Sequence, residues 1–186
     1  MDILTSLGLS IPAGLNAYIP LLAVALAQRF GWLTLREPFG VLGSWWLIAI
    51  IAVLLAVEIV ADKVPVVDHA NDVVQTLVRP AVGGIVAMAG SGSASTVSPW
   101  LLVIIGVLFA GGVHAAKATA RPAVNVTTGG TGAPLVSTAE DAGAVAMTAV
   151  AIALPILVVF FLAAIAAVLW WLWRRARRKR CDRLQS

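Results

Sequence analysis

The sequence predicts an all-α integral membrane protein with about four transmembrane helices and an additional re-entrant or interfacial helical segment. Of the 186 residues, 60% are hydrophobic and 12% are charged, which excludes a water-soluble enzyme and a disordered chain. Four apolar runs reach the length of about 20 residues that one crossing requires. Tryptophans lie near the ends of these runs, where the interface of a bilayer favours aromatic side chains.

A single membrane domain, residues 1–173, contains the four predicted spans, which are residues 3–28, 44–62, 99–117 and 142–173. The first and fourth are long and contain Pro12, Pro20 and Pro155. Because proline removes a backbone donor and bends a helix, each of these two segments is either a broken helix or a tilted helix with a kink. A broken helix at membrane depth is tolerated only where it is buried in protein or lines a cavity.

The region between the second and third spans is less regular. Residues 65–79 predict an amphipathic helix that stops before Pro80, and residues 80–90 are apolar but only about half a span long. We therefore expect residues 64–98 to be amphipathic and either re-entrant or interfacial rather than crossing; a fifth crossing is the alternative. Arg79-Pro80 recurs as Arg121-Pro122, which suggests an inverted repeat. The competing explanation is chance recurrence in a chain that is rich in alanine and valine.

Charged residues inside apolar runs are costly to bury and are functional candidates. Glu58 lies about 20 Å along a helix from Trp45, at about 1.5 Å per residue, and His114 follows Trp100 by a similar distance. If the two spans are antiparallel, Glu58 and His114 lie toward opposite sides of the membrane. We expect a polar site that binds a proton, a cation or a small anionic solute, and its candidate residues are Glu58, Asp62, Lys63, Asp68, Asp72, Arg79, His114, Lys117, Arg121, Glu140 and Asp141.

Two local patterns allow alternative interpretations. Asp68 and Asp72 share a helix face and, with His69, could hold a divalent cation such as Mg²⁺, Ca²⁺ or Mn²⁺; the alternative is an interfacial helix with its polar face in water. The spacing Ser137-x-x-Glu140 predicts a capping box at the start of the last helix, which explains one acidic residue and leaves its neighbour as a site candidate.

The C-terminal tail, residues 174–186, carries a net charge of +6, whereas the rest of the chain carries −2. It follows an aromatic run directly, so it predicts a membrane anchor on the cytoplasmic side of the membrane, bound to anionic lipid headgroups. This pattern argues against a nucleic-acid surface. The anchor residues are Trp170, Trp171, Trp173, Arg174 and Arg175.

Four spaced motifs together resemble a family of bacterial multi-pass membrane proteins of unknown function, the DUF4126-like family. They are Gly14-Leu15-Asn16-Ala17-Tyr18-Ile19-Pro20, Glu58-x-x-Ala61-Asp62-Lys63, His114-x-x-Lys117-Ala118-x-x-Arg121 and Ser137-x-x-Glu140-Asp141. The resemblance implies a bacterial inner-membrane protein whose motif positions are the charged groups named above. It implies no substrate.

The leading functional hypothesis is a small transporter or channel. Glu58 and His114 bind and release a proton or cation in this hypothesis, while the basic residues pair with carboxylates or hold an anionic group. Four spans are few for a complete pathway, so we expect a homodimer. The alternatives are a structural or assembly protein and a metal-dependent membrane enzyme acting on lipid phosphates, although no enzyme motif fits the sequence.

Overall fold

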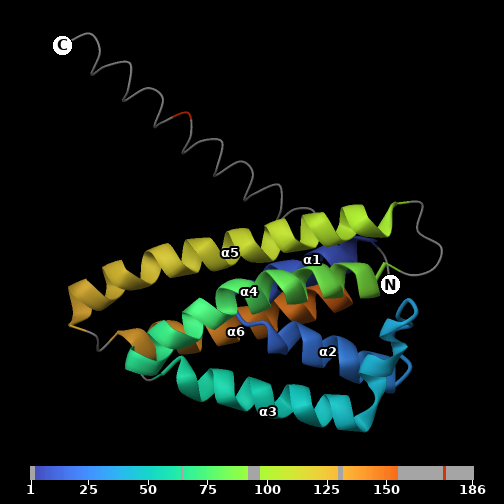
Figure 1. Ribbon diagram of the computed structural model, residues 1–186, viewed down its shortest axis with the longest axis horizontal. Coiled ribbons are helices and arrows are strands. Elements are labelled where there is room, and N and C mark those ends of the chain that lie inside the picture. The colour runs from blue at the N-terminus through green and yellow to red at the C-terminus, as the bar shows by residue number, and fades with distance from the viewer. Residues whose placement is uncertain (1–2, 64, 92–96, 130–131, 155–173, 175–186) are drawn as a thin grey trace.

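The computed structural model describes residues 3–63, 65–91, 97–129, 132–154 and 174, and every regular element in these ranges is helical. The helices pack into an elongated bundle (Figure 1). Their bounds are α1 Ile3–Ala13, α2 Tyr18–Arg29, the 3₁₀ helix η1 Phe39–Gly43, α3 Trp45–Ala61, α4 Pro65–Ala89, α5 Pro99–Thr128 and α6 Ala133–Ala153.

Residues 3–28 do not form one long helix. The segment is broken, which was one of the two predicted alternatives, into α1 and α2, which are joined by a tight turn at residues 14–17. The two half-length helices fold back on each other, so the start of α1 and the end of α2 lie at the same end of the bundle (Figure 1). A hydrogen bond from Arg36 N to Ala89 O, 3.0 Å long, joins the segment after α2 to the end of α4. The α1–α2 hairpin therefore places its turn in the middle of the bundle.

Helix α4 continues through Pro80, which corrects the predicted stop before that residue. The expected separate piece at residues 80–90 is the second half of this 25-residue helix. Close packing on α5 explains the continuity: a Cβ atom at Gly83 would lie 2.7 Å from the carbonyl oxygen of Gly106. Contact between the two backbones stabilises the helix where local sequence favours a break.

The third and fourth predicted segments also differ from the helices. Helix α5 runs through Pro122 to Thr128 instead of ending at residue 117, and α6 begins at Ala133 instead of residue 142. Ser137 lies inside α6 and is buried, so the predicted capping box is wrong. Residues 155–173, the second half of the predicted fourth span, lie outside the described residues.

The direction of the helices shows that the condition under which Glu58 and His114 would lie on opposite sides, antiparallel second and third spans, is not met. Because α4 is a complete helix between them, α3 and α5 run in the same direction through the bundle (Figure 1). Glu58 on α3 and His114 on α5 consequently lie at the same level and not on opposite sides.

The core is built from small and branched apolar residues of five helices, among them Leu9, Ala13, Val24, Val86, Ala110 and Ala151. The outer face of α3, in contrast, exposes Val53, Val57 and Val60. Among the described helices, α5 and α6 are long and apolar enough to cross a membrane, judged by length and composition. The four-span arrangement stays a prediction.

Candidate functional site

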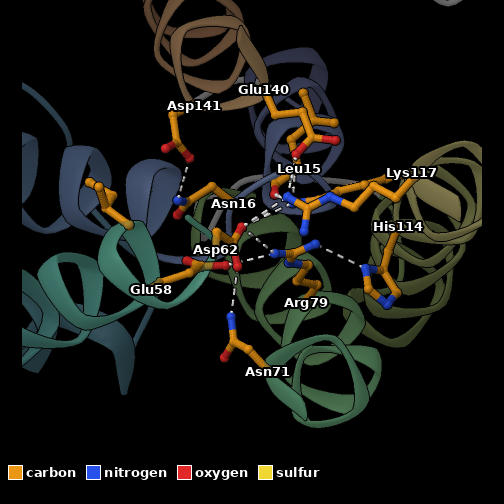
Figure 2. A network of polar contacts seen from close by, with 12 residues as sticks. Leu15, Asn16, Glu58, Asp62, Asn71, Arg79, His114, Lys117, Glu140 and Asp141 are labelled. Carbon is orange, nitrogen blue, oxygen red and sulfur yellow. Dashed lines mark hydrogen bonds and ion pairs between the residues drawn. The ribbon is translucent and has the colours of Figure 1, made fainter. Parts of the chain in front are cut away.

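A network of charged side chains surrounds the turn of the α1–α2 hairpin (Figure 2). Among the described residues it contains four cations and four carboxylates, contributed by α5, α6, α4 and the C-terminal end of α3 with the turn after it. The cations are Lys63, Arg79, Lys117 and Arg121, and the carboxylates are Glu58, Asp62, Glu140 and Asp141. Ion pairs join six of these sequence-predicted candidates into one cluster, and Lys63 with Asp141 forms a separate pair at its edge.

Asp62 is the centre of the network. Its Oδ2 atom lies 3.2 Å from Lys117 Nζ, 3.3 Å from Arg121 Nη2 and 3.6 Å from Arg79 Nη2. Asn71 Nδ2 donates to the other oxygen, Oδ1, over 2.8 Å. Only 2% of the Asp62 side chain is exposed, so the three cations replace the solvation that burial removes.

Arg79 is fully buried and connects a carboxylate to an imidazole. Its Nη2 atom donates to Glu58 Oε1 over 2.9 Å, and its Nη1 atom lies 3.1 Å from His114 Nδ1. A guanidinium group can only donate, so Nδ1 of His114 must accept. The ring proton therefore sits on Nε2, which faces Thr76 Oγ1 at 3.1 Å. His114 is a neutral imidazole in this arrangement.

Lys117 links α5 to three other parts of the chain. Its ammonium group donates to the carbonyl oxygen of Leu15 in the hairpin turn over 3.1 Å and to Asp62, and it lies 3.0 Å from Glu140 Oε2. An ammonium has three donors, so these three oxygens match its capacity. The contact with Leu15 also places a cation at the carbonyl end of α1, where the helix dipole favours positive charge.

Asn16 provides the hydrogen-bond acceptor for the N–H groups at the start of α2, on the other side of the turn. Its Oδ1 atom accepts hydrogen bonds from the backbone N–H groups of Tyr18 and Ile19, which are first-turn donors of α2. Its Nδ2 atom donates to Asp141 Oδ1 over 3.0 Å. Asp141 in turn lies 3.7 Å from Lys63 Nζ, whose side chain is 38% exposed. The hairpin turn is therefore held by side chains of α5 and α6.

Glu140 closes the network on the α6 side. Its Oε2 atom accepts from Arg121 Nη2 over 2.7 Å while also facing Lys117. At 14% its side chain is more exposed than those of Glu58 and Asp62. Glu58, although almost fully buried, has an Oε2 atom that accepts no hydrogen bond from the described residues. The Oε2 atom of Glu58 is therefore able to bind a proton.

The structure brings together most of the residues that the sequence singled out. The exceptions are Asp68 and Asp72, which lie in α4 together with His69 but whose side chains are outside the described ones. The described residues form no group of three or more His, Cys, Asp or Glu side chains that could hold a metal ion. Of the predicted anchor, Arg174 is described and exposed, whereas Trp170, Trp171, Trp173 and Arg175 lie outside the described residues.

Three neutral residues belong to the site although the sequence did not identify them as members: Asn16, Asn71 and Thr76. A signal existed for Asn16, which interrupts an apolar run between two prolines. Asn71 and Thr76 lie in a polar stretch, where nothing distinguishes an inward-facing amide or hydroxyl from a solvated one.

Comparison with known protein families finds one that matches most of the chain. The family described as a domain of unknown function (DUF4126) matches residues 3–175 of the chain. No curated protein and no solved structure matches the chain.

Proposed function

The chain belongs to the family described as a domain of unknown function (DUF4126), and on that premise we propose that it is a small multi-pass membrane transporter or channel. The charge network around the hairpin turn is its binding site for a proton, a cation or a small anion. One observation carries the proposal: the charged side chains lie inside the bundle while branched apolar side chains cover the outside of α3. A protein dissolved in water favours the reverse distribution.

The broken α1–α2 segment supports transport over a purely structural role. Helix ends at membrane depth are tolerated where they line a cavity or contact protein, and transporters use such ends to bind ions and solutes. Here both ends meet the network, through Lys117 on the Leu15 carbonyl and through Asn16 on Asp141. The proposal locates the solute at this point, midway along the bundle.

The same proposal puts the chain in the bacterial inner membrane, with the basic tail on the cytoplasmic side bound to anionic lipid headgroups. A homodimer would supply the helices that a complete pathway needs. A structural or assembly protein is the second candidate, and the balance of four cations and four carboxylates favours it. In that case the charges would only fix the packing of the helices.

Flux through Glu58→Gln protein separates the two candidates. The variant keeps the shape of the side chain and removes the charge that faces Arg79, so transport predicts loss of ion flux in proteoliposomes with a protein that still purifies as a single species. Glu37→Gln, the same chemical change at an exposed position outside the network, is the control and should transport as wild type does. Wild-type proteoliposomes that pass no proton, cation or small anion would contradict the proposal.

A further inference from the structure

Glu140 occupies the position of an anion. Its carboxylate oxygen Oε2 lies 3.0 Å from Lys117 Nζ and 2.7 Å from Arg121 Nη2, so two cations of neighbouring turns of α5 converge on one oxygen atom. The two cations are themselves buried, with exposed side-chain fractions of 2% and 9%. A buried pair of cations that converges on a carboxylate has the chemistry of an anion-binding site.

Of the described carboxylates that contact both Lys117 and Arg121, which are Asp62 and Glu140, Glu140 can leave with the smaller rearrangement. Helix α6 packs on α1 and α2 and hardly touches α5, so the ion pairs of Glu140 bridge two helices that share little other surface. Asp62 and Glu58, in contrast, are enclosed by α3, α4 and α5 and are almost completely buried. Withdrawal of Glu140 would open the site while Asp62 continued to hold Lys117 and Arg121 in place.

Charge balance dictates what must accompany an incoming anion. The described side chains of the network comprise four cations and four carboxylates, so their charges balance, and an uncompensated charge in such a buried position is strongly unfavourable. Among the described side chains, Glu140 contacts Lys117 and Arg121 on α5, and both of these cations also contact Asp62. The Lys63–Asp141 pair lies at the edge of the same network, with Asp141 next to Glu140 in the sequence of α6. An anion that enters without a proton leaves this group of residues with one excess negative charge. Protonation of the displaced Glu140 carboxylate restores the balance.

We propose that Lys117 and Arg121 form a binding site for a small monocarboxylate anion, that Glu140 occupies this site when the anion is absent, and that the anion displaces Glu140 as the Glu140 carboxylate takes up one proton. A monocarboxylate is the expected ligand class because the present occupant is itself a carboxylate on a short chain. The inference rests on the proposed transport function, since it names the substrate class of the same site.

Chemical rescue tests the site directly. Glu140→Ala leaves Lys117 and Arg121 without their carboxylate partner on α6 and should lower the melting temperature of the full-length protein in mild detergent. Acetate or formate should raise the melting temperature of this variant by several degrees, whereas chloride at the same ionic strength should not. In Glu37→Ala, the matched control, acetate should have no such effect. Rescue by acetate no greater than in the control would overturn the proposal.

Proton uptake tests the displacement and does not depend on the stability of the alanine variant. Titration calorimetry of wild type with acetate, in two buffers of different ionisation enthalpy, should show about one proton taken up per acetate bound, since protonated Glu140 is the displaced group. Glu140→Gln should bind acetate at least about tenfold more tightly, because a tethered competitor is gone, and without proton uptake. Acetate binding to wild type without proton uptake would refute the displacement, and so would unchanged affinity in Glu140→Gln.

The two proposals fail separately. Ion flux that requires Glu58 but no rescue of Glu140→Ala by acetate or formate would leave the transport function standing and remove the carboxylate site. Rescue with the predicted proton uptake, in a protein that passes no ion or solute in liposomes, would establish the site and remove the transport function.

Discussion

At the scale of single residues, the ammonium group of Lys117 joins the hairpin turn, the end of α3 and α6 to α5. Replacing it in Lys117→Met keeps the apolar stem but leaves the Asp62 and Glu140 carboxylates and the Leu15 carbonyl without this partner. Breaking a buried ion pair by removing one partner costs about 3–5 kcal/mol, so we expect a large loss of stability. Thermal or denaturant-induced unfolding in mild detergent measures it.

Lys63→Met is the matched control, because Lys63 is the most exposed cation of the network and pairs only loosely with Asp141, at 3.7 Å. Exposed pairs contribute less than about 1 kcal/mol, so this variant should unfold close to wild type. Equal losses in the two lysine variants would mean that the buried network does not hold the hairpin turn.

The candidate site was predictable from the sequence as far as its charges, since an ionisable residue in an apolar run is conspicuous whatever its partners are. The pairing was not predictable. Glu58 and Asp62 were known to share a helix face, but which of the cations meets which carboxylate depends on the positions of α4, α5 and α6 relative to each other. Neutral partners such as Asn71 can be identified only once the position of the carboxylate that they contact is known.

At the scale of elements, α2 begins in the middle of the bundle, where Asn16, Ala17 and Ile19 are buried and the first N–H groups need partners from the protein. Asn16 satisfies two of them, and in Asn16→Ala both lose their acceptor while Asp141 loses a donor. Loss of a helix cap costs about 0.5–2 kcal/mol, and burial places the expected effect at the upper end. Unfolding measurements on Asn16→Ala and Asn16→Ser compare the two, because serine can still cap the helix. A serine variant no more stable than the alanine variant would contradict the capping role.

The α4–α5 contact depends on glycine. A Cβ atom at Gly106 would lie 2.7 Å from the Cβ of Ala87, so Gly106→Ala should separate the helices at a cost of about 1–3 kcal/mol. Gly112 lies on the same helix, and a Cβ atom added there would meet nothing within 4 Å, so Gly112→Ala should be neutral or stabilising by up to about 1 kcal/mol. Melting temperatures of the two variants in detergent provide the measurement; a Gly106→Ala variant as stable as Gly112→Ala would show that close packing at Gly106 does not set the effect.

Helix ends were the least predictable part of the fold. Pro80 suggested an end of α4 and apolar run length suggested an end of α5 at residue 117, yet α4 continues through Pro80 and α5 continues through Pro122. Proline disfavours a helix through one lost hydrogen bond and one local clash, whereas packing acts along the whole helix and can outweigh both. The break between α1 and α2 was open in the sequence for the same reason: Pro12 and Pro20 allowed it, and the partners at the turn decided it.

At the scale of the whole molecule, the direction of the helices makes a prediction about sidedness. The segment after α2 and the end of α5 lie at opposite ends of the bundle (Figure 1). With Cys181 replaced by serine, single cysteines introduced at the exposed positions Thr34 and Thr127 should react with an impermeant maleimide from opposite sides of the membrane. Labelling of intact cells and of inverted vesicles provides the measurement, and labelling of both positions from the same side would contradict the arrangement.

Composition and the length of the apolar runs determined, without any structure, that the chain is helical. They also determined that the charged residues of interest lie around Glu58, His114 and Glu140, because a charge within an apolar run is costly to bury and is recognisable from the local sequence alone. Only the tertiary structure decided that residues 3–28 fold back on themselves, that α3 and α5 are parallel and that six of the described charged side chains join in one cluster beside the hairpin turn. These properties arise from contacts between distant segments, such as the one between Asn16 and Asp141, which are 125 positions apart. Local sequence carries no record of which distant partner a residue will meet.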